Sequence, residues 1–478
     1  MAETGHMVSR PPQRLSEEEL AALARLGSPL IDALGAWLNR CLSCAHCKRC
    51  TRRCEVLESS ALDIGSVQAD FERIAALEPD SRDDAVLLLV QERPELYHAL
   101  RQCCFCGHCT ATCATHMAAA ARMREWRKPL MAAGLMPPDA SKLVMVDNEW
   151  HIFSAYRAIH GISYPEFTQL ADAAAARGGG TATEGGRNEG TAAPVTTDTL
   201  FFPGCSLASY APELMRRIGQ WFDAAGYRWA MTVECCGSPL MSAGLFERSE
   251  ALRRGLLEQM RAAGITRVFT VCPGCGEELA EVVDGEMDIL PLPELLLERL
   301  SAGDGAEGEG ATDAETGPCP FREGGTGTGP WGARPSLTFF DSCHDRFDTR
   351  HGTAVRKLLK ACLPSSSQVE MPHHGKDTLC CGAGGAVAAY DADITQRRVW
   401  RVIDEARGTG AGTLVTTCPT CTYTIAQALL GAAPEQNIPS HNYLELVFEQ
   451  PIDWPLVFGQ LEAMWTGEYG PWLTQTFF

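Results

Sequence analysis

Cysteine is the residue type whose spacing in this sequence points to chemistry. Two stretches share the spacing C-x2-C-x2-C-x3-C, with ligand candidates at Cys44, Cys47, Cys50, Cys54 and at Cys103, Cys106, Cys109, Cys113. One such run places three thiolates around a four-iron cluster, and its fourth cysteine reaches a second cluster. Zinc knuckles are the alternative, but zinc ligands usually come as two separated pairs. The spacing therefore predicts two [4Fe-4S] cubane clusters.

The same spacing predicts which thiols share a cluster. One cubane takes Cys44, Cys47, Cys50 and Cys113, and the other takes Cys103, Cys106, Cys109 and Cys54. Cys41 and Cys104 are extra and are interpreted as buried, non-ligand thiols. Four basic residues surround the first motif: Lys48, Arg49, Arg52 and Arg53. They either tune the cluster and dock an acidic partner, or only balance charge on a solvated helix.

Ten further cysteines form a five-residue pattern that occurs twice in the same order. The two sets are Cys205, Cys235, Cys236, Cys272, Cys275 and Cys343, Cys380, Cys381, Cys418, Cys421. Corresponding members lie 138 to 146 residues apart, which indicates an internal duplication. A vicinal pair brings two thiolates to one cluster, and we expect the glycine after it to let the backbone approach the inorganic core. Ordinary four-iron clusters, or degenerate sites kept as scaffold, are the alternatives.

Three histidines accompany the second set. His344 directly follows Cys343, so it is the candidate catalytic residue that delivers a proton beside a reducing cluster. The alternative is a hydrogen bond from His344 to a sulfur or a backbone carbonyl. His373 and His374 are expected to have such structural roles.

The elements that position the five-cysteine sets alternate between strands and helices. In each copy a strand-like run ends at the first cysteine (TLFFPGC, then SLTFFDSC), and another precedes the last pair (RVFTVCPGC, then TLVTTCPTC). Helical patterns lie between them, as at residues 211–225 and 396–406. This alternation predicts an α/β fold with parallel sheets, whose ligands lie beyond the C-terminal ends of the strands.

Composition divides the chain into seven segments. They are an N-terminal helical segment (1–35), a helical domain with the two cubane motifs (36–170), a linker (171–198), a first cysteine-rich unit (199–300), a Gly-rich acidic linker (301–336), a second cysteine-rich unit (337–450) and a Trp-rich tail (451–478). The tail holds Trp454, Trp465 and Trp472, a density that suits a docking surface for a partner. Packing of the tail on its own domain is the alternative.

Charge and hydropathy exclude several functions. With 41 Lys and Arg against 60 Asp and Glu, the formal charge is −19, so nucleic acids and anionic lipid surfaces are poor partners. No apolar stretch is long enough to cross a membrane, and no signal peptide is apparent, so a cytoplasmic protein with reduced thiols is expected. The Gly-rich tracts do not connect a strand to a helix, so neither a flavin nor an NAD site is expected.

Both kinds of motif resemble known families. The first two resemble the α-helical ferredoxin domain of succinate dehydrogenase iron–sulfur subunits and of heterodisulfide reductase, although Glu55 and Ala114 replace the proline that usually follows the fourth cysteine. The five-cysteine sets resemble the CCG cysteine-rich domain of heterodisulfide reductases, glycolate oxidase iron–sulfur subunits and the third subunit of anaerobic glycerol-3-phosphate dehydrogenase. The resemblance implies one or two non-cubane [4Fe-4S] clusters at these sets, and a disulfide that is cleaved between them.

The fusion of the two parts resembles fused heterodisulfide reductases. It also resembles cytoplasmic subunits of membrane redox complexes, such as the high-molecular-weight cytochrome c complex of sulfate reducers. This implies a reductase subunit that passes electrons through the cubanes to a disulfide-type substrate, such as one on a small protein. The implied partners are other iron–sulfur subunits and membrane-bound quinone-binding or multihaem cytochrome subunits, which would hold the chain on the inner face of the cytoplasmic membrane.

Two other functions stay open. The chain is alternatively an iron–sulfur relay subunit of a flavin-dependent glycolate, lactate or anaerobic glycerol-3-phosphate dehydrogenase that feeds quinone. A non-enzymatic scaffold is the third hypothesis, and the intact ten-cysteine pattern weighs against it.

Overall fold

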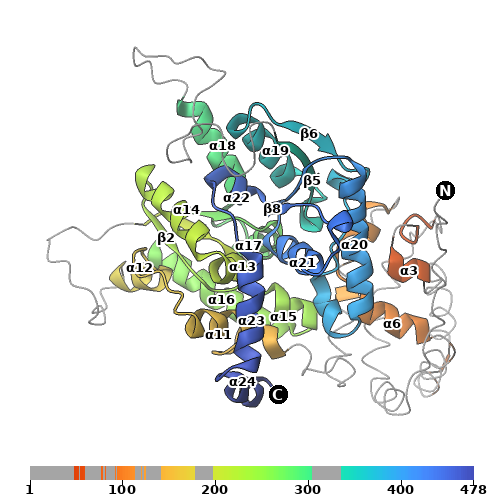
Figure 1. Cartoon of the computed structure of the whole chain (residues 1–478). Coiled ribbons are helices and arrows are strands. Elements are labelled where there is room, and N and C mark those ends of the chain that lie inside the picture. Colours follow the sequence, from red (N-terminus) through yellow and green to blue (C-terminus); the bar gives the residue numbers. More distant parts are fainter. Residues whose placement is uncertain are drawn as a thin grey trace. The chain divides into compact units, whose positions relative to one another are not determined.

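The computed structural model describes residues 48–52, 54–59, 77–78, 81, 92, 94–113, 120, 123–124, 142–177, 197–303 and 335–478 (Figure 1). The chain divides into two compact units. Unit 1 comprises Met1–Ser141, Met241–Phe246 and Gly384–Ile394, and unit 2 comprises Lys142–Leu240, Glu247–Ala383 and Thr395–Phe478. Several predictions concern residues outside the described ones: the helical segment 1–35, Cys41, Cys44, Cys47, Arg53 and most of both linkers.

Unit 2 contains two four-stranded parallel sheets with the same topology. The strand order is β2-β1-β3-β4 in the first sheet and β6-β5-β7-β8 in the second. The strands are β1 (Thr199–Phe202), β2 (Trp229–Met231), β3 (Arg267–Thr270), β4 (Asp288–Pro291), β5 (Ser336–Phe340), β6 (Ser367–Glu370), β7 (Thr413–Thr416) and β8 (Ser440–Asn442). The predicted α/β fold with two repeated units is confirmed.

Helices connect the parallel strands of each copy, because a parallel pair needs a long crossover. The first copy has α13 (Gly204–Tyr210), α14 (Pro212–Ala224), α15 (Ser238–Ala243), α16 (Phe246–Ala263), α17 (Pro273–Val283) and α18 (Leu292–Gly303). The second has α19 (Arg350–Cys362), α20 (Ala392–Gly408), α21 (Pro419–Leu429) and α22 (Tyr443–Phe448), with short 3-10 turns η2 (Cys343–Asp345), η3 (Gly375–Asp377) and η5 (Pro434–Gln436).

One hydrophobic core connects the two copies. Every residue of β1 is buried, as are four of the five residues of β5, which explains why both strands are unbroken apolar or Thr-containing runs. Phe201 and Phe222 from the first copy belong to the same buried cluster as Phe339 and Tyr443 from the second. The cysteine-bearing loops of both copies are therefore supported by a shared core.

Unit 1 is helical in its described part, as the ferredoxin resemblance predicted. It contains α3 (Glu55–Ser59), α6 (Pro94–Gln102), α7 (His108–Ala111) and the 3-10 segment η4 (Gly384–Ala389). The segment around η4 is bound to α6, because Gln102 Nε2 donates a hydrogen bond to Asp391 Oδ2 (2.7 Å) and the Arg101 guanidinium lies over the Tyr390 ring. At Gly385, with φ +68°, a Cβ would lie 2.3 Å from the carbonyl oxygen of Cys103, so only glycine fits this approach.

The structure differs from the predicted linker 171–198 at its start. Residues up to Arg177 continue α12 (Leu170–Arg177), with Leu170 and Ala173 buried. Alanine has the highest helix propensity of any residue type, so the alanine run in this segment favours a helix. Arg177 Nη1 also donates a hydrogen bond to the carbonyl oxygen of Ala263. Ala-rich composition, which suggested a linker, therefore forms a helix once it has an apolar surface to cover.

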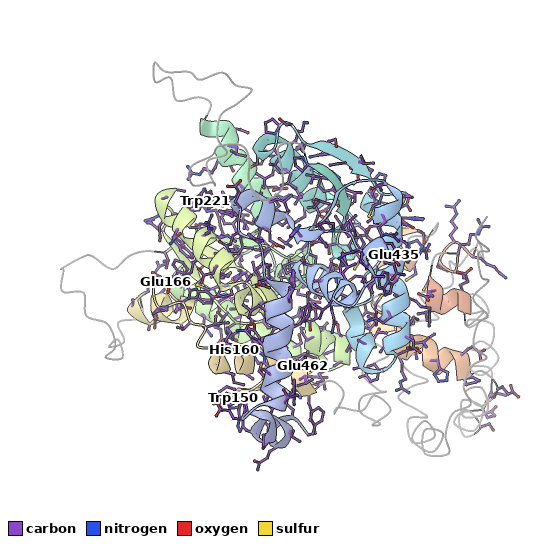
Figure 2. The ribbon with its side chains drawn as sticks, in the orientation of Figure 1. Trp150, His160, Glu166, Trp221, Glu435 and Glu462 are labelled. Carbon is purple, nitrogen blue, oxygen red and sulfur yellow. The ribbon has the colours of Figure 1, made fainter. Side chains whose placement is uncertain are left out.

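The C-terminal tail forms α23 (Trp454–Thr466) and α24 (Gly470–Phe477), which pack with α11 (Ile152–Ile159). Trp454, Met464 and Phe477 are buried in this cluster, and Trp150, labelled beside the tail helices in Figure 2, contacts Trp472 edge-on at 5.0 Å. The packing alternative thus accounts for these side chains. Leu456, Tyr469 and Phe478 stay exposed, and a docking role for them stays a prediction.

A helix that spans a membrane needs about 20 predominantly apolar residues. None of the helices in the described ranges is long and apolar enough to meet this requirement.

Candidate metal centre

The first five-cysteine set lies at the C-terminal ends of three neighbouring strands, as predicted. Cys205 follows β1 in the first turn of α13, Cys235 and Cys236 follow β2, and Cys272 caps α17 directly after β3. The Sγ atoms of Cys205 and Cys235 are 3.8 Å apart. Thiol contacts with Cys236 and Cys272, followed by burial, raise the pKa of Cys275 well above its usual value.

The second set repeats this arrangement. Cys343 follows β5 at the start of η2, Cys380 and Cys381 precede α20, and Cys418 caps α21 directly after β7. Cys421 Sγ donates a hydrogen bond to Cys381 Sγ at 3.3 Å. Contacts with Cys381 and Cys418, followed by burial, raise the pKa of the Cys421 thiol well above its usual value.

The two sets meet at one pair of sulfurs. Cys272 Sγ and Cys418 Sγ, the caps of α17 and α21, are 3.7 Å apart. Each belongs to the first cysteine of a Cys-Pro-x-Cys motif. The duplicated sites therefore face each other instead of lying on separate surfaces.

The donor set fits iron–sulfur clusters. Soft thiolates select iron–sulfur clusters, copper(I) or zinc over hard cations, and the sulfurs of each set lie in contact, at 3.8 Å in the first and 3.3 Å in the second. Seven of these ten thiols are buried, so ionising several of them together without a nearby cation is costly. A positively charged iron core offsets that cost, which is why a crowd of buried thiols is typical of a cluster site.

The glycines after the vicinal pairs also meet a conformational requirement, and their expected role beside a cluster stays a prediction. Gly237 and Gly382 both have φ +85°, a left-handed conformation that side chains rarely adopt. A Cβ on Gly237 would lie 2.6 Å from Ser249 Oγ, and one on Gly382 would lie 3.1 Å from Thr395 Cα. Each glycine therefore faces the following helix, α16 or α20, and allows the turn to pack there.

His344 connects the two copies. Its Nδ1 lies 2.5 Å from Oε2 of Glu277 on α17, and its ring lies against Gly274, between the two cysteines of the first Cys-Pro-x-Cys motif. Burial opposes a charge on this ring, but the Cys343 thiol and Glu277 outweigh burial and raise the pKa of His344 to about 10. His344 therefore carries a proton at neutral pH beside both cysteine sets, and its catalytic role stays a prediction.

His373 and His374 have structural partners. His373 Nδ1 lies 2.7 Å from Glu405 Oε1, and His374 Nδ1 lies 2.8 Å from the carbonyl oxygen of Met371. These contacts agree with the structural roles expected for both residues.

Buried charges that the sequence did not single out hold the second site in place. Arg346 is 1% exposed, and its guanidinium donates to the carbonyls of Cys343, Lys376 and Thr378. It therefore ties the loop of Cys343 to the segment before Cys380. Asp345 accepts from the backbone N–H groups of His351 and Gly352, and burial raises its pKa to about 7. An arginine and an aspartate within three residues of a ligand cysteine were a weak signal of this role.

The described cubane cysteines lie in unit 1 (Cys50, Cys54, Cys103, Cys106, Cys109 and Cys113). Burial raises the pKa of Cys109, and Cys103, Cys54 and Cys50 raise it further, so thiols of both motifs act on this sulfur. Cys104 is buried and its Sγ lies within 4.8 Å of Cys106 Sγ, and its non-ligand role stays a prediction. The assignment of four ligands to each cubane stays a prediction, because Cys44 and Cys47 lie outside the described residues.

Comparison with known families agrees with this geometry. Residues 199–280 and 337–426 match the cysteine-rich domain called CCG, one match for each sheet. The fold and the site thus define a protein with two CCG domains.

Similar proteins narrow the class further. An uncharacterized iron–sulfur protein of Methanococcus maripaludis is 25% identical over 254 residues, which are 52% of this chain and 45% of that protein. A dihydromethanophenazine:CoB–CoM heterodisulfide reductase subunit of Methanosarcina barkeri is 23% identical over 270 residues, 53% of this chain and 58% of that protein. A probable iron–sulfur-binding oxidoreductase of Bacillus subtilis is 24% identical over 126 residues, 26% of this chain and 18% of that protein.

This chain thus contains two CCG domains and is similar in part to iron–sulfur proteins that include a heterodisulfide reductase subunit, in agreement with the predicted resemblance. It spans less than two thirds of the length of each of these relatives. One solved structure, a putative Asp/Glu racemase from Yersinia pestis, aligns with 54% of this chain and 100% of its own at 9% identity, but its TM-score of 0.25 is too low to bear on fold or function.

Proposed function

We propose that this chain is the electron-transfer and reductase subunit of a multi-subunit respiratory complex. Electrons pass through two cubane clusters to the paired CCG sites, where a disulfide-type substrate is reduced, or a dithiol is oxidised in the reverse direction. The observation that carries the proposal is the 3.7 Å distance between Cys272 Sγ and Cys418 Sγ. A disulfide bound at this junction is within reach of both sets.

The cofactors follow from the donor sets. Two [4Fe-4S] cubanes are held by the eight cysteines of the first two motifs, and one or two non-cubane [4Fe-4S] clusters by the two CCG sets. When bound, these clusters supply the electrons one at a time.

The chain's own residues manage protons. Reduction of a disulfide takes up two electrons and two protons and yields two thiols. His344 supplies one proton, which its contact with Glu277 keeps on the ring, and solvent supplies the other. Glu277 also fixes the orientation of the ring through Nδ1.

Replacing His344 by glutamine tests this role. We expect kcat for disulfide reduction to fall by about a hundredfold, because a positioned general acid contributes about 10²- to 10⁴-fold. KM and iron content should stay unchanged. The matched control is His373→Gln, which removes a histidine that is also bound to a carboxylate. Equal rates in the two variants would leave His344 with only a structural role.

Iron content tests the proposal as a whole. The anaerobically isolated chain should contain about sixteen irons, two four-iron cubanes plus two four-iron CCG clusters. Chelation of the iron should abolish disulfide reduction. About eight irons, with no unusual paramagnetic signal after oxidation and thiol addition, would refute the reductase function.

Partners and location form the finer part of the proposal. We expect membrane-bound quinone-binding or multihaem cytochrome subunits and other iron–sulfur subunits, which place this chain on the cytoplasmic face of the membrane. The alternative is a relay that serves a flavin-dependent glycolate, lactate or glycerol-3-phosphate dehydrogenase and feeds quinone. Co-purification with a flavoprotein dehydrogenase would favour the relay.

A further inference from the structure

Two buried polar atoms next to the metal centre have unused hydrogen-bonding capacity. His351 is 2% exposed and Tyr443 is fully buried, yet His351 Nε2 and Tyr443 Oη find no partner among the described residues. Their rings contact each other edge-on, with centroids 5.5 Å apart. An unsatisfied buried polar group costs about 1–3 kcal/mol, so two in contact need a reason.

Both side chains belong to elements that follow cysteine-bearing strands. His351 is the second residue of α19, just beyond the Cys343 turn, and its backbone N–H is held by Asp345 Oδ1 at 2.9 Å. Tyr443 begins α22 directly after β8, the strand that pairs with β7 before Cys418. Cys418 acts electrostatically on His351, and Cys272 acts on Tyr443. The two side chains therefore lie close enough to the sulfur pair that joins the two CCG sets to interact with it electrostatically.

A cavity of about 10 Å³, large enough for one water, lies between α13, α21 and α23, lined by residues that include Tyr210, Asn442 and Trp454. Neither His351 nor Tyr443 lines it, so a water in this cavity would not satisfy their polar atoms.

The duplication shows that the fold does not require these donors. In the first copy the second residue of α14 is Glu213, which is exposed, and the first residue of α18 is Leu292, which is buried and apolar. Neither gives a buried donor at the equivalent position. His351 and Tyr443 therefore make the junction chemically asymmetric, although the two sheets are alike.

We propose that His351 Nε2–H and Tyr443 Oη–H donate hydrogen bonds to the sulfurs at the Cys272–Cys418 junction, and thereby raise the reduction potentials of the CCG clusters. This inference rests on the proposed iron–sulfur sites. Hydrogen bonds to cluster sulfurs stabilise the more negative, reduced form. His351 and Tyr443 act through the sulfurs, so they are positioning residues.

The test replaces Tyr443 by phenylalanine in the full chain, isolated anaerobically. The CCG-cluster signal is followed by EPR during a redox titration, and its exchangeable protons by ENDOR in H2O and D2O. We expect reduction to become about tenfold less favourable, or about 59 mV lower for one electron, with one exchangeable coupling lost. His351→Leu should lower the potential in the same way. His351→Gln keeps an N–H donor, so its potential should lie closer to that of the unsubstituted chain.

Tyr156→Phe is the matched control, because the Tyr156 hydroxyl is already satisfied by Gln460 Oε1 at 2.6 Å. It should change neither potential nor couplings. Partial cluster loading does not hide the result, because the reduction potential and the proton couplings are measured only on molecules that contain the cluster. Unshifted potentials with all couplings kept would overturn the inference, and so would complete loss of iron in a folded Tyr443→Phe chain. Absence of CCG iron from the unsubstituted chain would instead refute the proposed function.

Discussion

Replacing Cys380 and Cys381 together by alanine should lower the iron content from about sixteen to about twelve per chain and abolish disulfide reduction. The pair supplies two of five thiols, and Cys381 Sγ accepts a hydrogen bond from Cys421 Sγ. Three remaining thiols fall short of the four cysteines that usually hold a four-iron cluster. We expect the rate to fall at least about a thousandfold, or about 4 kcal/mol of transition-state stabilisation. Iron assay, EPR and turnover on the same samples measure the effect.

Two comparison variants define what the loss means. Cys362→Ala removes a buried cysteine of α19 that belongs to neither set, and it should keep about sixteen irons and most of the activity. Cys235→Ala with Cys236→Ala removes the equivalent pair of the first set and should also cost about four irons. If the second double variant loses none, only one CCG site holds a cluster. Full activity in the Cys380/Cys381 variant would rule out reduction at this site.

The second large effect is expected at Arg346. Its guanidinium is 1% exposed and serves three carbonyls, on Cys343, Lys376 and Thr378. Replacing Arg346 by methionine keeps much of the volume but leaves these buried acceptors unpaired, each at a cost of about 1–3 kcal/mol. We expect a total loss of about 3–5 kcal/mol. The apparent Tm of the anaerobic protein should fall by roughly 10 °C.

Arg350→Met is the matched control for Arg346. Arg350 is about half exposed and pairs with Glu294 on α18, and an exposed ion pair contributes about 0–1 kcal/mol. The Tm of the Arg350→Met variant should differ from that of the unsubstituted chain by no more than a few degrees. Equal shifts in the two variants would show that Arg346 does not hold the Cys343 and Cys380 loops together. In that case the iron of the second CCG set should also be unaffected.

Much of the CCG region could be predicted from local patterns. Strand-like runs before Cys205 and Cys343 appear as β1 and β5, and those before Cys272 and Cys418 appear as β3 and β7. These predictions succeed because a strand buried on both faces must be apolar along its whole length, which is visible in sequence. The parallel order followed from strand–helix alternation.

Composition was a weaker guide at the chain's connections. Residues 171–177 read as linker but form the end of α12, because Leu170 and Ala173 bury an apolar face. Trp454 suggested docking by its type, yet it packs with Tyr423 and Phe458. Whether an apolar side chain faces a partner or its own domain depends on neighbours that are distant in sequence, such as α11.

The sequence by itself determined the ligand types, the duplication and the placement of Cys205, Cys272, Cys343 and Cys418 after strands, because spacing and periodicity are local properties. Only the tertiary structure decided that Cys272 and Cys418, 146 residues apart, bring their sulfurs within 3.7 Å. It also decided that Glu277 of one copy meets His344 of the other, and that His351 Nε2 and Tyr443 Oη are buried without a partner among the described residues. These relations depend on how two sheets share one core, and no local pattern encodes that packing.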